Sequence, residues 1–165
     1  MKFDKFLIIK IFIILVNFQF ILHPTKTNAA EDIKIIYSIF SRTIKVDSLK
    51  TFALEGNSTK ELKRILKATG STDKEIRLVL NKNFEIPIAI ANKLIYSEIG
   101  NVFLTRLSSI IRTSRAKDER TGMLALRASI IQGIKMGNGK INMINFFEAY
   151  PTKTIILDVN ALSKV

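Results

Sequence analysis

The stretch from Met123 to Met136, which reads MLALRASIIQGIKM, constrains the fold of this chain more than any other part of the sequence. Apolar residues fall on nearly every side of a helical wheel drawn through it. Its polar exceptions are Arg127, Ser129, Gln132 and Lys135. Four polar residues are too few to form a solvated face, so a helix here must be largely buried. We therefore expect a central helix around which the other helices of the domain pack.

The first 30 residues have the pattern of an export signal. Lys2 and Lys5 form a basic start, residues 6–22 form a mostly apolar run, and Ala29 and Ala30 close a small-residue segment suited to cleavage. The apolar run is interrupted by polar residues and is short for a stable membrane span, which needs about 20 apolar residues. We therefore predict export to a periplasm, a lumen or the cell exterior, with cleavage after Ala29 or Ala30. The alternative is an uncleaved segment that anchors the protein in a membrane.

The remainder, residues 31–165, has the size of one domain. The signal segment holds four lysines and one aspartate, so the other 135 residues carry 22 basic and 13 acidic residues, a net charge of +9. A chain of this length buries about two thirds of its unfolded surface, which suffices for one core. The sequence has no cysteine, so no disulfide supports the exported fold and the core alone must stabilise it.

The strand signals lie at the two ends of this domain. Residues 33–38 and 42–46 are short β-branched runs that predict a hairpin, and the alternation at residues 155–159 predicts a strand that joins it. Helical periodicity dominates the sequence between them. The predicted fold class is therefore mainly α: a single compact multi-helix domain with a small antiparallel sheet made of the N-terminal hairpin and the C-terminal strand.

Capping residues mark where these helices begin. Ser58 with Glu61, and Thr72 with Glu75, have the hydroxyl–glutamate spacing of a capping box. Asp47 and Asp118 are suited to cap the first helix and the central helix, respectively. The helix ends are predicted at Gly56, Gly70, Asn138-Gly139 and Pro151.

Apolar stripes at helical spacing predict which residues form the core. Phe52 falls on the stripe of the first helix, and Phe103 on a long one near the middle of the chain. Residues predicted to point inward on these and neighbouring helices include Ile76, Val79, Leu80, Leu94, Ile95, Ile99, Val102, Leu107, Ile110 and Ile111. Residues 113–120 have no apolar periodicity and are predicted to form a charged loop.

Several short segments, taken in order, carry a family resemblance. They are Ile36-Tyr37, residues 44–46 running into Leu49, Phe52 and Gly56, residues 94–100, residues 111–113, residues 125–128 and residues 150–152. Together they resemble a cyanobacterial domain of unknown function that occurs at the N-terminus of exported alpha/beta-hydrolase-like proteins. This chain ends at Val165 with no hydrolase domain after the match, so the resemblance implies an accessory domain on its own.

The residue types present argue against catalysis. The only histidine, His23, lies in the predicted signal segment, and the sequence has no Gly-x-Ser-x-Gly elbow. A Ser or Cys nucleophile lacks its base, and zinc lacks its usual ligands.

Asp118 and Glu119 are adjacent acids that do not face each other on a helix and fit a solvated helix start. Residues 137–140, Gly-Asn-Gly-Lys, follow a helix and fit its end better than a phosphate loop. We predict no catalytic residue, no metal and no cofactor; an enzyme using carboxylates alone ranks last.

Basic residues are the candidates for binding. Arg127 is a charge within the most apolar helix, so it must reach the surface or meet a carboxylate or several carbonyls. It is either a structural buried pair or an anion-binding residue. The other candidates form a basic cluster of Arg112, Arg115, Lys117 and Arg120.

These features lead to two functional hypotheses. The first is an exported non-catalytic interaction domain whose partner is a hydrolase or another exported protein. The alternative is a peripheral domain that binds anionic lipid through its basic surface. Nucleic acid is not an expected partner, because export and the lack of aromatic residues interleaved with the basic ones argue against it.

Overall fold

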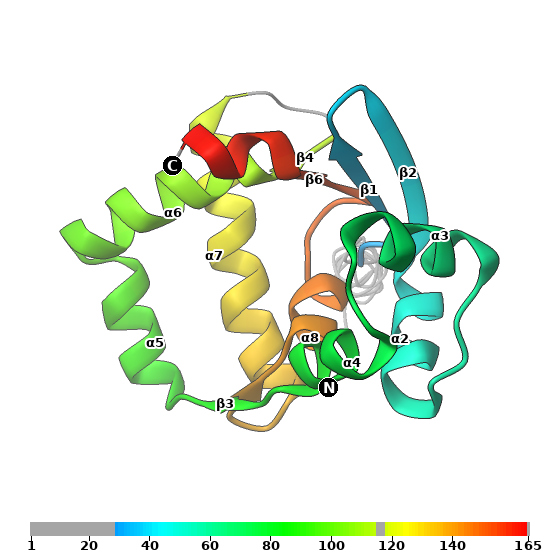
Figure 1. Cartoon of the computed structure of the whole chain (residues 1–165). Coiled ribbons are helices and arrows are strands. Elements are labelled where there is room, and N and C mark those ends of the chain that lie inside the picture. Colours follow the sequence, from blue (N-terminus) through cyan, green and yellow to red (C-terminus); the bar gives the residue numbers. More distant parts are fainter. Residues whose placement is uncertain (1–28, 115–117, 165) are drawn as a thin grey trace, which may run out of the picture.

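The computed structural model describes residues 29–114 and 118–164 (Figure 1). The predicted signal segment therefore lies outside the described residues, except for Ala29, which is exposed, and Ala30, which is buried in the core. The prediction of a compact, mainly α domain with a small sheet is confirmed. In chain order the elements are β1 (Asp32–Tyr37), β2 (Phe40–Lys45), α2 (Val46–Glu55), α3 (Lys60–Thr69), α4 (Asp73–Asn81), β3 (Phe84–Glu85), α5 (Ile88–Ile95), α6 (Glu98–Ile110), β4 (Ile111–Thr113), α7 (Glu119–Met136), β5 (Lys140–Ile141), α8 (Met143–Glu148), β6 (Thr154–Asp158) and η1 (Val159–Lys164).

The larger sheet joins the two ends of the domain. Its strand order is β2-β1-β6-β4, with the predicted hairpin of β1 and β2 at one edge. The C-terminal strand β6 pairs with β1 as predicted, but in parallel, so the sheet is mixed. Strand β4 differs from the prediction, because its three residues lie where a helical apolar stripe meets a predicted loop. It completes the sheet by pairing antiparallel with β6. A second, two-stranded sheet joins β3 and β5.

Most predicted helix ends are confirmed, with two corrections at helix starts. The capping box of Thr72 and Glu75 is present, and the backbone N–H of Thr72 lowers the pKa of the Glu75 carboxyl. The first corrected cap is that of α3, where Thr59 accepts from the N–H of Leu62 at 3.2 Å; Ser58 lies outside the helix, so no box forms with Glu61. The second is that of α2, which begins one residue before Asp47 and places that carboxylate in its first turn.

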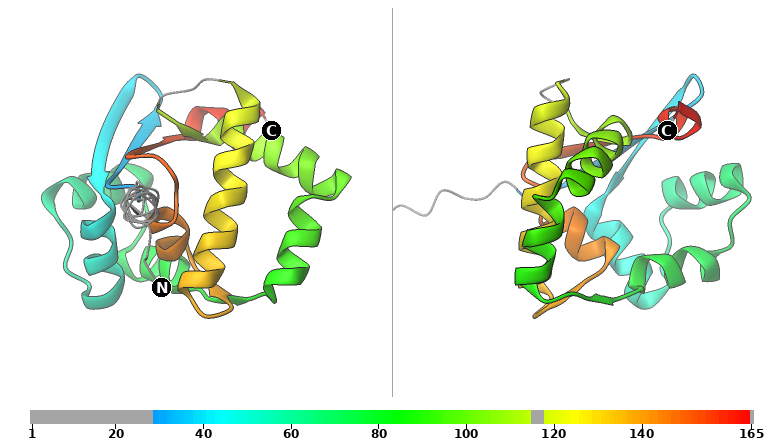
Figure 2. Two further views of the ribbon diagram at one scale, coloured as in Figure 1. Left: turned by 180° about the vertical axis from the view of Figure 1, so that it is seen from behind. Right: turned by 90° about the vertical axis from the view of Figure 1, so that its left-hand side faces the viewer.

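Helix α7 is central, but it is not wrapped on all sides. Helices α5, α6 and α8 all contact it, and its buried positions include the small residues Gly122, Ser129 and Gly133. A Cβ added at Gly122 would lie 2.9 Å from the Cβ of Ser108 on α6, so these helices approach closely on that face. The opposite face is open to solvent, as the rear view in Figure 2 shows. There Leu124 and Met136 are half-exposed, and Gln132 and Lys135 are exposed.

The core prediction succeeds for α2 and fails for parts of α4, α5 and α6. Phe52 is fully buried, as predicted, whereas Phe103 is 61% exposed. On α6 the neighbouring residue Leu104 is buried in place of Phe103. Other residues on the predicted apolar stripes are also exposed: Leu54, Val79, Ile88, Leu94, Ile99 and Val102.

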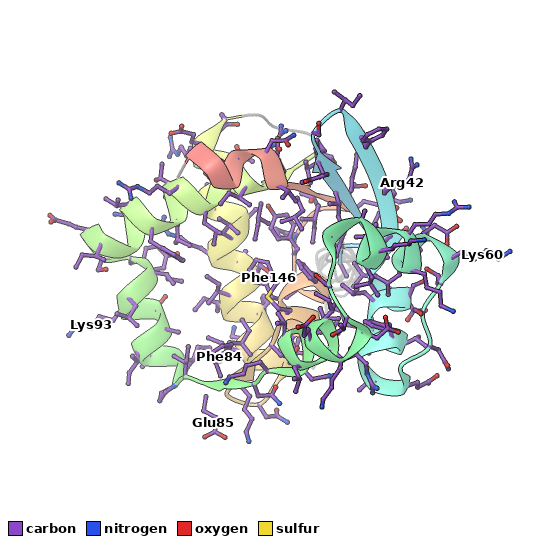
Figure 3. All side chains as sticks on the ribbon, viewed as in Figure 1. Arg42, Lys60, Phe84, Glu85, Lys93 and Phe146 are labelled. Atoms are coloured by element: carbon purple, nitrogen blue, oxygen red, sulfur yellow. The ribbon has the colours of Figure 1, made fainter. Side chains whose placement is uncertain are left out.

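Tyr150 is a fully buried side chain whose hydroxyl has no hydrogen-bond partner among the residues that the structure describes. Its ring packs edge-on against Phe146, the residue labelled near the centre of Figure 3. Burial raises the pKa of the Tyr150 phenol above its ordinary value of 10.0. An unpaired buried hydroxyl is costly, because it loses its hydrogen bonds to water without replacement.

We therefore expect Tyr150→Phe to raise the free energy of unfolding by about 1–2 kcal/mol at neutral pH. Because the folded-state pKa is the higher one, wild type loses stability as the pH rises above about 10, when the unfolded chain ionises first. The phenylalanine variant lacks that loss, so its advantage grows at alkaline pH. Urea unfolding at pH 7 and pH 10.5 checks both statements. A variant less stable than wild type would show that the hydroxyl has a bonding partner in solution.

Candidate interaction surface

Arg127 connects three helices through its guanidinium group. It extends from α7 and is half-buried. Its Nε donates to the backbone oxygen of Ile95 at 3.1 Å, its Nη2 donates to the Oδ1 of Asn101, and its Cζ lies 4.5 Å from the centre of the Tyr96 ring. The Ile95 carbonyl is among the last four of α5, which have no partner within their own helix. Arg127 thus caps the negative end of α5.

These contacts decide between the ways in which Arg127 could be accommodated. Two carbonyl oxygens and an aromatic face receive the charge, and no described carboxylate forms an ion pair with it. Of the two kinds of partner expected for Arg127, a carboxylate or several carbonyls, the described residues supply the carbonyls.

The predicted basic cluster is not a single free surface. The Nη2 of Arg112 forms an ion pair with the Oδ2 of Asp158 at 3.0 Å, with both side chains mostly buried, and this pair links β4 to the end of β6. Arg115 and Lys117 lie outside the described residues. Arg120 is exposed in the first turn of α7. Among the described members, only Arg120 is therefore exposed to solvent.

A surface that the sequence analysis missed lies on α5 and α6, which form one side of the domain (Figure 1). Its residues, here called the α5–α6 apolar face, are half or more exposed: Ile90, Leu94, Ile99, Val102 and Phe103. Ile99, Val102 and Phe103 share one face of α6 because they follow helical spacing. The other face of α6 packs on α7, where Thr105 contacts Met123 and Ser108 contacts Gly122. Large apolar side chains exposed together on two neighbouring helices are a candidate interaction site.

The junction between α5 and α6 is tightly built. The Ser97 hydroxyl donates to the Leu94 carbonyl at 2.7 Å and accepts from the Gly100 N–H at 3.0 Å. A Cβ at Gly100 would lie 2.0 Å from the Leu94 carbonyl oxygen, so only glycine fits. Lys93 and Arg106 are exposed on the same two helices, and Figure 3 shows Lys93 pointing away from the domain. The α5–α6 apolar face is therefore held in a fixed shape and has basic residues beside it.

One sequence signal could have revealed this face. Six of the eight residues of α5 are Ile, Leu or Ala at positions spread around the helix, yet only Ala91 and Ile95 are buried. A short helix at the edge of a domain contacts the rest of the domain along one side and can bury only one stripe. The surplus of apolar residues therefore indicates a second contact surface.

The acids and the glycine turn have structural roles. Asp118 caps α7 by accepting from the N–H of Thr121 at 2.8 Å, and that bond lowers the pKa of the Asp118 carboxyl. No group of three or more His, Cys, Asp or Glu side chains in the described ranges could hold a metal ion. Gly139 has a positive φ of 91° in the turn after α7, and Lys140 pairs with Glu85 at 2.7 Å, which confirms that residues 137–140 end a helix.

Comparison with known proteins identifies a family for most of the chain. Residues 29–158, which is most of the chain, match a protein family described as an alpha/beta hydrolase of unknown function. No curated protein and no solved structure matches significantly. Within residues 29–114 and 118–164, no helix is long and apolar enough to cross a membrane.

Proposed function

The chain belongs to the protein family described as an alpha/beta hydrolase of unknown function, and from that premise we propose that it is an exported, non-catalytic accessory domain that binds a hydrolase. The α5–α6 apolar face carries the proposal. It is supported by the residue types, since the sequence contains no Gly-x-Ser-x-Gly elbow and its one histidine, His23, lies in the predicted signal segment. The partner contributes the catalytic residues, and this domain contributes a fixed apolar surface.

The partner is tested with a photo-crosslinking amino acid placed at Val102, which is 56% exposed. We expect a hydrolase from the exported fraction to be crosslinked, and Phe103→Asp to reduce its yield at least tenfold, because a carboxylate would be buried in the interface. Leu78→Asp is the matched control, since Leu78 is equally exposed but lies on α4. Equal loss in both variants, or ester turnover by the purified chain itself, would contradict the proposal.

The second candidate is peripheral binding to anionic lipid, and Lys93 and Arg106 beside the α5–α6 apolar face favour it. Each basic residue close to an anionic leaflet contributes about 1 kcal/mol, or roughly fivefold in affinity. Co-sedimentation with phosphatidylglycerol vesicles should then weaken in salt and in the variants Lys93→Gln and Arg106→Gln. Equal binding to phosphatidylcholine vesicles would rule out this candidate.

A further inference from the structure

We propose that the groove between the β1–β2 hairpin and α3 is a binding site for a long-chain fatty acid, which would place its alkyl chain in the groove and its carboxylate against Arg42 and Arg64. The groove lies away from the α5–α6 apolar face, on the other side of the domain in Figure 1. Fatty-acid binding in this groove goes beyond the accessory role and does not depend on it, because ligand binding and partner binding are measured separately.

The floor of the groove is one face of the hairpin. Antiparallel pairing sets Ile33 opposite Ile44, Ile35 opposite Arg42, and Tyr37 opposite Phe40, so these pairs share a face. The first pair is buried in the core. The next two pairs extend beyond it, and Tyr37 and Phe40 are more than half exposed. The core-facing side of the sheet therefore continues outward as an uncovered apolar shelf.

Helix α3 supplies the facing wall. Ile65, Ala68 and Arg64 line the groove from α3, and Val159 closes it at the start of η1. The right-hand view of Figure 2 shows the hairpin and α3 projecting from the same side of the domain. The groove is open to solvent along one side and has a volume of about 680 Å³, which is in the range of about 300–1,000 Å³ that small-molecule sites occupy. The size and the largely apolar walls suit an alkyl chain better than a sugar or a nucleotide, which need several polar partners.

Two arginines give the groove its charge preference. Arg42 occupies a core-facing position on β2, between Phe40 and Ile44, and Figure 3 shows it just above α3. Its Nη1 donates to the adjacent Ser41 carbonyl at 3.2 Å. No described carboxylate lies within ion-pair distance of Arg42 or Arg64. A guanidinium group presents paired donors that match the two oxygens of a carboxylate, so these residues favour an acid at the end of the apolar chain.

The test is titration of the purified full chain with palmitate, below its micelle concentration, by isothermal calorimetry. We expect one site per chain, and an affinity at least tenfold lower in the double variant Arg42→Gln/Arg64→Gln, because charge-assisted hydrogen bonds are lost. Both arginines are exposed, so the unliganded melting temperature should not change. Hexadecanol, which has the same chain length without the charge, should bind wild type and the double variant equally.

Arg106→Gln is the matched control, since Arg106 is also exposed but lies on α6, and it should bind palmitate as wild type does. Palmitate affinity unchanged by the double variant would overturn the proposal. So would competition in which an acidic peptide, and not palmitate, occupies the groove. Crosslinking at Val102 should be unaffected by the double variant, so failure of this site and failure of the accessory role are distinguishable.

Discussion

The Phe52→Ala variant should unfold with a free energy about 3–5 kcal/mol lower than wild type, because truncation removes a fully buried ring and leaves a cavity. Phe52 lies on α2, where Leu49 and Ala53 are buried with it. Small domains have a total stability of only about 5–15 kcal/mol. This one substitution should therefore remove a large part of the stability of the domain.

Phe103→Ala is the matched control, since it deletes the same atoms from a ring that is 61% exposed. Its free energy of unfolding should change by less than about 0.5 kcal/mol. Chemical denaturation of both variants, analysed with a common slope, gives the comparison. Equal destabilisation would mean that Phe103 is buried in solution, for example by a second molecule, and dilution would then reduce its effect.

Arg127→Met should lower the free energy of unfolding by about 2–4 kcal/mol. The substitution keeps the apolar stem but leaves the Ile95 carbonyl and the Asn101 side chain without the guanidinium that donates hydrogen bonds to both of them. It also removes the cation from the Tyr96 ring. Because the partners are fixed parts of α5 and α6, the variant should loosen the junction of these helices with α7.

Arg106→Met provides the reference, because Arg106 is exposed on α6 and its loss should be nearly neutral. Hydrogen exchange locates the effect. The amides of α5 should exchange faster than in wild type in the Arg127→Met variant and at the wild-type rate in the Arg106→Met variant. If Arg127 instead binds an anionic ligand, the unliganded stability of Arg127→Met would equal that of wild type, and only ligand-dependent stabilisation would disappear.

The sequence predicted features that local chemistry determines. Periodicity and caps located the helices, as at Thr72 and Asp118, because these signals act within a few residues. The cap of α3 moves from Ser58 to Thr59 because the neighbouring hydroxyl is an equivalent acceptor. Helix α2 begins at Val46 with no side-chain cap, so Asp47 lies in its first turn, and its start is not decided by local cap chemistry.

Burial depended on tertiary packing and was harder to predict. Phe52 and Phe103 look alike in sequence, and they differ because α6 turns Leu104 toward its partner helix and leaves Phe103 outside. The sequence could not identify which groups accept hydrogen bonds from Arg127. One is the Ile95 carbonyl at the end of a helix 32 residues away, and the other is the Asn101 side-chain amide 26 residues away. The groove arginines gave a partial signal. Arg42 interrupts the apolar alternation of its strand, which indicates a core-facing position without a core around it.

The parallel pairing of β1 with β6 has a consequence for how the domain acquires its structure. Asp32 lies opposite Thr154, and the Ser38 N–H donates to Asn160 across 122 positions of chain. Contacts between residues so far apart carry a large loop-closure entropy and slow the folding reaction. β1 lies between β2 and β6, so during synthesis the sheet cannot be completed until β6 has left the ribosome. Until then β1 and β4 both lack the strand that lies between them in the finished sheet.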